Sequence, residues 1–206
     1  IYKDESDKII DLLKNIQHYR PYFDMEYAEY LVGRFKLDKK KPIKEYSKGM
    51  QSSLNVIIGL ASRAPLTILD EVYLGMDAPA REIFYKEILE DQQRYPRMII
   101  LSTHLVSEMD YLFDEVIFLD KGSILLQEDT ETLSSKGVTI IGNKETVDKF
   151  VNSKQIINTE QLGSTVSVTI YGEMNDEEMA TVVRQGLEVR PVSLQDLFVH
   201  LTEEDV

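Results

Sequence analysis

The stretch Leu66-Thr67-Ile68-Leu69-Asp70-Glu71 decides the fold, because it has the pattern of a buried strand that ends in two acids. A second apolar run, Met98-Ile99-Ile100-Leu101, leads into Ser102-Thr103-His104, and a helical pattern over 80–93 separates the two runs. Strands that alternate with helices predict a mostly parallel sheet. The acids and His104 should then lie at the same edge of that sheet, where the strands end and ligands bind.

Upstream of these strands the pattern is helical. Helices are expected over 6–18 and from about residue 25, the second capped by Asp24, so residues 1–46 predict a small helical unit. Ser47 is a good N-cap for a further helix over 48–62, which Pro65 ends.

Downstream, a short helix over 105–112 and a strand over 115–119 precede Asp120-Lys121-Gly122, which predicts a hairpin turn into 123–127. The run Ser134-Ser135-Lys136-Gly137 has the composition of a boundary. Beyond it, alternating and helical patterns predict a small α+β domain. Its expected strands are 138–141, 155–159, 165–171 and 187–190, and its expected helices are 144–151, 176–185 and 193–201.

Composition excludes several classes of site. The chain of 206 residues has no cysteine, so disulfides and thiolate metal sites are excluded. A net charge of −13 disfavours nucleic-acid phosphates as a partner. The densest basic run, Lys39-Lys40-Lys41 with Lys44, is interpreted as a solvated turn, with a phosphate or lipid-headgroup contact as the alternative. No apolar stretch approaches the roughly 20 residues that a membrane-spanning helix needs, and no signal peptide is recognised.

Asp70-Glu71 suits nucleotide hydrolysis. Carboxylate oxygens suit Mg²⁺, which bridges the phosphates of a bound nucleotide, and a second carboxylate can orient or deprotonate the attacking water. His104 at the same edge could hydrogen-bond a γ-phosphate. Taken singly, however, two acids after a strand are as readily explained by capping, and a lone histidine by structure. His18 and His200, on amphipathic helices, are interpreted as structural.

Ser47-Lys48-Gly49 opens a helix. Unpaired N–H groups and the helix dipole make such an N-terminus a phosphate-binding position, and Lys48 adds positive charge. A serine in this position is also a common helix cap, so the tripeptide alone is a weak signal.

The joint order of these pieces resembles the ATP-binding cassette (ABC) ATPases. Tyr46-Ser47-Lys48-Gly49-Met50-Gln51 is similar to the signature motif, Asp70-Glu71 to the end of the Walker B strand, Gly75-Met76-Asp77 to the D-loop, and His104 to the switch histidine. The bacterial antibiotic-response and export ATPases encoded beside GntR-type regulators are the most similar in character. The stretch Ser193–Thr202 resembles the end of the accessory domain that some of them carry.

For the fold, the resemblance implies an α/β protein with part of a P-loop NTPase core. Residues 1–46 would be the helical subdomain, 47–133 the C-terminal part of the ABC ATPase core, and 137–206 an α+β accessory domain.

For the nucleotide, the resemblance implies that Ser47 and Gly49 contact the γ-phosphate of ATP held by a partner ATPase subunit, with Lys48 beside them. Asp77 would communicate across that homo- or heterodimer.

For catalysis, the resemblance implies that Asp70 holds Mg²⁺ through water, Glu71 is the catalytic base and His104 is the switch. The cofactors are therefore expected to be ATP and Mg²⁺. The intact protein is expected to couple ATP hydrolysis to motion of a membrane permease, from the cytoplasmic face of the cell membrane.

The sequence departs from the family pattern in three places. The signature has Lys48 and Met50 where Gly and Gln are usual, and Val72 replaces the usual proline after the acids. No Gly-x-x-x-x-Gly-Lys-Ser/Thr occurs, although this Walker A loop supplies most phosphate contacts. We therefore expect a C-terminal portion of the subunit that hydrolyses no ATP alone. Two alternatives remain open: a non-catalytic dimerisation or regulatory module, and a soluble ABC ATPase unconnected with transport.

Overall fold

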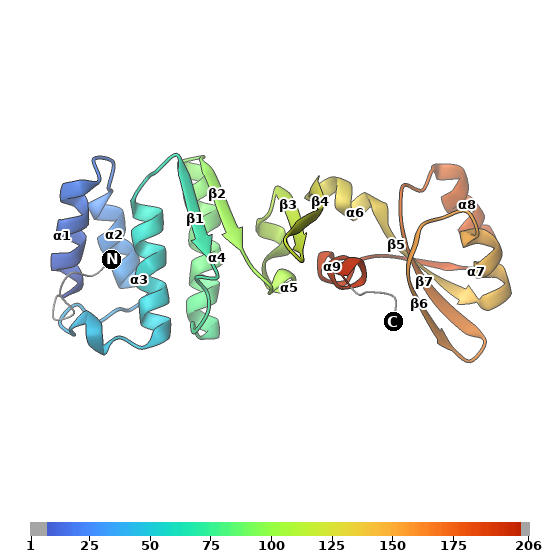
Figure 1. Cartoon of the computed structure of the whole chain (residues 1–206), viewed down its shortest axis with the longest axis horizontal. Coiled ribbons are helices and arrows are strands. Elements are labelled where there is room, and N and C mark those ends of the chain that lie inside the picture. The colour runs from blue at the N-terminus through green and yellow to red at the C-terminus, as the bar shows by residue number, and fades with distance from the viewer. Residues whose placement is uncertain (1–7, 203–206) are drawn as a thin grey trace. The chain divides into compact units, whose positions relative to one another are not determined.

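The computed structural model describes residues 8–202, which form two compact units (Figure 1). The first unit ends at His104 and the second begins at Leu105. Among residues 8–202, no helix has both the length and the apolar character that crossing a membrane requires.

The first unit begins with helices that pack on one another. They are α1 (Ile9–Tyr19), α2 (Met25–Arg34), a 3₁₀ turn η1 (Ile43–Glu45) and α3 (Lys48–Ala61). Asp24 caps α2, as predicted, by accepting a hydrogen bond from the Tyr27 N–H at 2.9 Å. The predicted start of the first helix at residue 6 lies outside the described residues. Helix α3 is the centre of this unit, because it packs against α2, α4 and β1 and buries apolar side chains on several sides.

The sheet of the first unit consists of β1 (Leu66–Asp70) and β2 (Met98–Ser102), joined by α4 (Ala78–Arg94). The two strands are parallel and pair in register from Leu66↔Met98 to Asp70↔Ser102. Burial alternates along β1: Thr67 and Leu69 face Gly59 of α3, whereas Leu66 and Ile68 are exposed. Both strands therefore end at one edge, as their order predicts.

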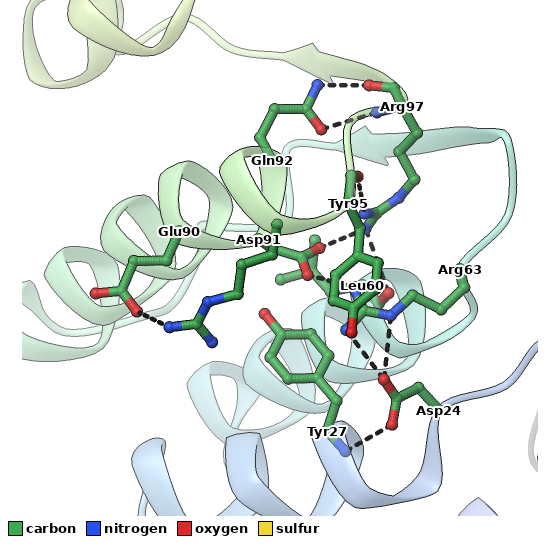
Figure 2. A network of polar contacts seen from close by, with 10 residues as sticks. Asp24, Tyr27, Leu60, Arg63, Glu90, Asp91, Gln92, Tyr95 and Arg97 are labelled. Atoms are coloured by element: carbon green, nitrogen blue, oxygen red, sulfur yellow. Dashed lines mark hydrogen bonds and ion pairs between the residues drawn. The ribbon is translucent and has the colours of Figure 1, made fainter.

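A polar network holds the opposite end of this sheet to the helices (Figure 2). The Arg63 guanidinium lies between the Tyr27 and Tyr95 rings, 4.3 and 4.1 Å from their centroids. It pairs with Asp24 at 3.1 Å and with Asp91, whose other oxygen accepts a hydrogen bond from Arg97 at 2.7 Å. The Asp91 side chain is only 1% exposed, so its charge is stabilised by two arginines rather than by water.

Tyr27, in this network, should make stability sensitive to alkali. Burial, and then the negative charges of Asp91 and Glu87, raise the pKa of Tyr27 above its ordinary value of 10.0. Stability from the neutral phenol is therefore complete below about pH 10 and is lost as the pH rises toward the folded-state pKa. We expect Tyr27→Phe to flatten the fall in thermal midpoint between pH 9 and about 11.5. A fall as steep as that of the wild type would contradict this prediction.

The second unit starts with α5 (Val106–Met109), a 3₁₀ turn η2 (Asp110–Leu112) and the hairpin of β3 (Glu115–Asp120) and β4 (Ser123–Asp129). The predicted turn is confirmed: Asp120 pairs with Ser123, and the two residues between them, Lys121 and Gly122, have φ angles of 46° and 80°. Both lie in the left-handed region, which suits a two-residue hairpin loop.

The rest of the second unit is an antiparallel sheet with helices, as the α+β pattern predicts. Its strand order is β6-β7-β5-β8. The strands are β5 (Gly137–Asn143), β6 (Ile156–Leu162), β7 (Thr165–Tyr171) and β8 (Glu188–Pro191). The helices are α6 (Thr130–Lys136), α7 (Lys144–Val151), α8 (Asp176–Arg184) and α9 (Leu194–Thr202).

The parallel arrangement predicted from the alternation of strands and helices is confirmed for β1 and β2. Strands β3 and β4 pair antiparallel, as the predicted hairpin requires, and the strands from β5 onward are antiparallel as well. Residues 134–136, whose composition predicts a boundary, are the last residues of α6, which Asp129 caps, and β5 follows at once. Short polar residues suit a helix end as well as a loop, so composition alone did not separate the two.

The compact units also group residues differently from the predicted ranges 1–46, 47–133 and 137–206. Phe118 and Leu133 share a hydrophobic cluster with Leu197 of α9. The predicted division at 133–137 therefore falls inside the second unit, and the one at 46/47 falls inside the first. As limits of functional domains, the three ranges stay predictions.

Candidate functional site

Asp70 and Ser102 form a hydrogen-bonded pair at the carboxyl edge of the sheet. They are register partners, the last residues of β1 and β2. The Ser102 hydroxyl donates to Asp70 Oδ1 at 2.5 Å and accepts a hydrogen bond from the Glu71 N–H at 3.0 Å. One hydroxyl thus fixes the first carboxylate and the backbone of the second acid. Sequence reasoning gave Ser102 no role, although its place after an apolar strand was a signal.

The Glu71 carboxylate turns toward His104. Its backbone has a φ of 47°, a left-handed conformation that is uncommon for a residue with a side chain and typical of functional sites. Glu71 Oε1 lies 3.0 Å from His104 Nδ1, and Oε2 accepts a hydrogen bond from the Tyr73 hydroxyl. The side chains of Glu71 and His104 are 31% and 60% exposed, so both remain accessible to a ligand.

Tyr73 lies beneath this pair and is 1% exposed. Its oxygen is 3.0 Å from His104 Nδ1 and accepts a hydrogen bond from the His104 N–H at 3.1 Å. Burial raises the pKa of Tyr73 first, and the bond to Glu71 adds to that rise, while contacts with Thr103 and the His104 amide lower it. With its pKa above 10.0, the phenol keeps its proton at neutral pH. Tyr73 is the second residue that sequence reasoning missed.

The N-terminus of α3 packs on the loop that follows the two acids. Ser47 caps the helix, as predicted, by accepting a hydrogen bond from the Met50 N–H at 3.2 Å. Ser52 donates to the Leu74 carbonyl at 2.6 Å. The loop approaches so closely that a Cβ on Gly49 would overlap the Gly75 carbonyl oxygen. Gly75 itself has a φ of 81°, which favours glycine. Ser47 and Lys48 remain exposed at this helix end.

Gly49→Ala should therefore disturb this packing. The added methyl group meets backbone atoms of Gly75, which cannot turn aside as a side chain would. We expect the change to lower the free energy of unfolding by about 1–3 kcal/mol, the usual cost of overpacking. Urea unfolding of the chain would measure it. Gly33→Ala on α2, where a Cβ meets nothing within 4 Å, is the control and should cause no loss. Equal stability of the two variants would contradict the prediction.

Asp77 lies at the end of the same loop as the N-cap of α4. It accepts a hydrogen bond from the Ala80 N–H at 2.9 Å, and Pro79 lies in the first turn of that helix.

The contacts divide the predicted site residues into two groups. Hydrogen bonds through Ser102 link Asp70 to the Glu71 backbone, and the Glu71 carboxylate contacts His104, whereas the N-terminus of α3 contacts the loop that follows the acids.

Asp70 is suited to bind a magnesium ion whose remaining ligands come from other molecules. Among residues 8–202 no group of three or more acidic, histidine or cysteine side chains could enclose a metal. Asp70 is exposed and positioned by Ser102. Mg²⁺ keeps several waters and is often bound through one or two carboxylates plus substrate phosphates, which is the donor set that Asp70 can join.

Sequence comparison extends this picture beyond the site. A family model described as "AAA domain, putative AbiEii toxin, Type IV TA system" matches residues 17–110. The ABC transporter ATP-binding protein YtrB of Bacillus subtilis (strain 168) is 25% identical over 197 residues, which cover 95% of this chain and 65% of YtrB. The lantibiotic transport ATP-binding protein SrtF of Streptococcus pyogenes is 35% identical over 98 residues, which cover 48% of this chain and 42% of SrtF. YtrB and a second Bacillus subtilis relative, YdbJ, are both named as ABC transporter ATP-binding proteins.

Solved structures agree on the fold. An ABC transporter ATP-binding subunit matches 98% of this chain and 65% of its own chain, with a TM-score of 0.61 and 18% identity. The predicted class, an α/β protein related to the P-loop NTPase fold of ABC ATPases, is therefore confirmed. The chain spans less than two thirds of the length of YtrB, SrtF and this subunit.

Proposed function

We propose that this chain is the part of an ABC transporter ATPase subunit that carries the signature helix, the catalytic acids and the switch histidine. The intact subunit would couple ATP hydrolysis to motion of a membrane permease at the cytoplasmic face. The observation that carries the proposal is the joining of Asp70, Ser102, Glu71, Tyr73 and His104 by hydrogen bonds where two parallel strands end.

In this proposal the two acids have different roles: Asp70 binds the metal ion and Glu71 accepts a proton. Mg²⁺, bound through water to Asp70, would neutralise charge on the nucleotide phosphates. Glu71 would accept a proton from the attacking water, because its carboxylate is accessible and is held by hydrogen bonds at both oxygens. Ser102 keeps Asp70 and the Glu71 backbone in fixed relation, so both groups are positioned before substrate arrives.

The exposed N-terminus of α3 would act on a nucleotide held by a partner ATPase subunit. Ser47 uses its oxygen to cap the helix, which leaves its O–H free to donate to a phosphate. Gly49 brings the helix against the loop of Leu74 and Gly75, so that loop and helix end form one surface. Asp77, at the end of this loop, would transmit contact across the dimer. The same surface supports a second candidate, a module that activates a partner without hydrolysing ATP itself.

Calorimetric titration of this 206-residue chain with Mg-ATP tests the proposal first. The sequence contains no Walker A motif to provide the backbone cradle, lysine and hydroxyl that grip the phosphates, so we expect no binding at micromolar concentrations and no turnover. A complete subunit, in which a Walker A half precedes this chain, should bind and hydrolyse ATP. Micromolar binding by the chain alone would show that another element grips the phosphates, and an inactive complete subunit would contradict the ATPase role.

A further inference from the structure

The Tyr73 hydroxyl connects Glu71, the proposed base, with His104, the proposed switch histidine. A phenol has one proton, and in this site it is donated to Glu71 Oε2. The phenol oxygen is left as an acceptor: it receives the His104 backbone N–H at 3.1 Å, and the Thr103 side chain is a further hydrogen-bond partner. Because Tyr73 is 1% exposed, water does not compete freely for these bonds.

Counting donors and acceptors in the same way shows which nitrogen of the His104 ring carries the proton. Nδ1 lies 3.0 Å from the Tyr73 oxygen and 3.0 Å from Glu71 Oε1. An ionised carboxylate accepts hydrogen bonds only, and the phenol has already given its proton to Glu71. Nδ1 thus faces two acceptors and must carry a proton itself. In the neutral ring, the other nitrogen, Nε2, is then unprotonated.

We propose that Tyr73 is a positioning residue whose hydroxyl orients Glu71 and holds neutral His104 as the Nδ1–H tautomer. The contribution to catalysis rests on the ATPase function proposed above, whereas the tautomer does not. With Nε2 unprotonated, His104 can accept a hydrogen bond from the attacking water. It can donate to a phosphate oxygen only after Nε2 has gained a proton.

The tautomer can be measured on the nucleotide-free chain by long-range ¹H–¹⁵N NMR of the imidazole nitrogens at about pH 8, above the ordinary pKa of histidine. The chain has three histidines, so a His104→Gln variant assigns the signals. We expect Nδ1–H for His104 in the wild type. In Tyr73→Phe the ratio of Nδ1–H to Nε2–H should fall about two- to tenfold, the factor that one ordinary hydrogen bond contributes.

Tyr46→Phe is the matched control. Tyr46 is also buried, at 4% exposure. Its hydroxyl donates to the Asp38 carbonyl at 2.9 Å and not to Glu71. This variant should lose a similar buried hydrogen bond and leave the His104 tautomer unchanged. The proposal is overturned if His104 is Nε2–H in the wild type, if Tyr73→Phe keeps the wild-type ratio, or if both tyrosine variants shift it equally.

A second measurement separates the tautomer from the proposed function. In the complete subunit, Tyr73→Phe should lower kcat while the KM for ATP stays within about twofold, since Tyr73 is 1% exposed and positions catalytic groups. A wild-type subunit without ATPase activity would contradict the proposed function and leave the NMR result standing. An active subunit in which Tyr73→Phe has normal kcat would contradict the positioning role in catalysis.

Discussion

Glu71→Gln in the complete subunit is expected to lower ATP turnover by about 10²–10⁴-fold while ATP still binds, the range that loss of a general base produces. The amide keeps the size of the carboxylate and can still accept a hydrogen bond from Tyr73. It cannot take a proton from water. Steady-state hydrolysis with parallel equilibrium binding of ATP measures the two effects separately.

The same variant should also accumulate as a closed dimer with ATP, because the step that would release the nucleotide no longer occurs. Size-exclusion chromatography with and without Mg-ATP detects that species. Glu82 is an exposed residue of α4. Glu82→Gln makes the same chemical change at a residue other than the two acids Asp70 and Glu71, and it should leave turnover unchanged. Turnover of Glu71→Gln within a few-fold of the wild type would remove Glu71 as the base, whatever the state of assembly.

The largest loss of stability is expected for Asp91→Ala. Asp91 is the shared partner of Arg63 and Arg97, whose side chains are 13% and 6% exposed (Figure 2). Removing the carboxylate leaves two poorly hydrated guanidinium groups without their common counter-charge. We expect the free energy of unfolding to fall by about 3–5 kcal/mol, the usual cost of removing one partner from a buried ion pair. Urea unfolding of the chain measures the loss.

Glu90→Ala, one residue earlier, is the matched control. Glu90 pairs with Arg94 at 3.5 Å and Lys86 at 3.8 Å, and both cations are 63% exposed. Surface pairs of this kind contribute about 0–1 kcal/mol, so the control should cost little. If the two variants unfolded at the same urea concentration, the Arg63–Asp91–Arg97 network would not be what holds α4 and the start of β2 to the helices.

Much of the fold follows from local sequence. The alternation of strand and helix between residues 66 and 102, the caps Asp24 and Ser47, and the Lys121-Gly122 turn were all predicted, because caps and tight turns depend on a few neighbouring residues. The strand order β6-β7-β5-β8 of the second unit was not predicted, because a short apolar run specifies a strand but does not specify its partner.

The sequence by itself determined the chemical types at the site: two acids and a histidine at strand ends, and a serine-capped helix with Gly49. The placement of Asp70, Glu71 and His104 at one edge of the sheet followed from the rule that parallel strands end at one edge. Only the tertiary structure decided that Ser102 bridges Asp70 and the Glu71 backbone, and that buried Tyr73 joins Glu71 to His104. Those bonds depend on strand register and on a left-handed residue after β1, which bring together side chains that sequence spacing alone leaves unrelated.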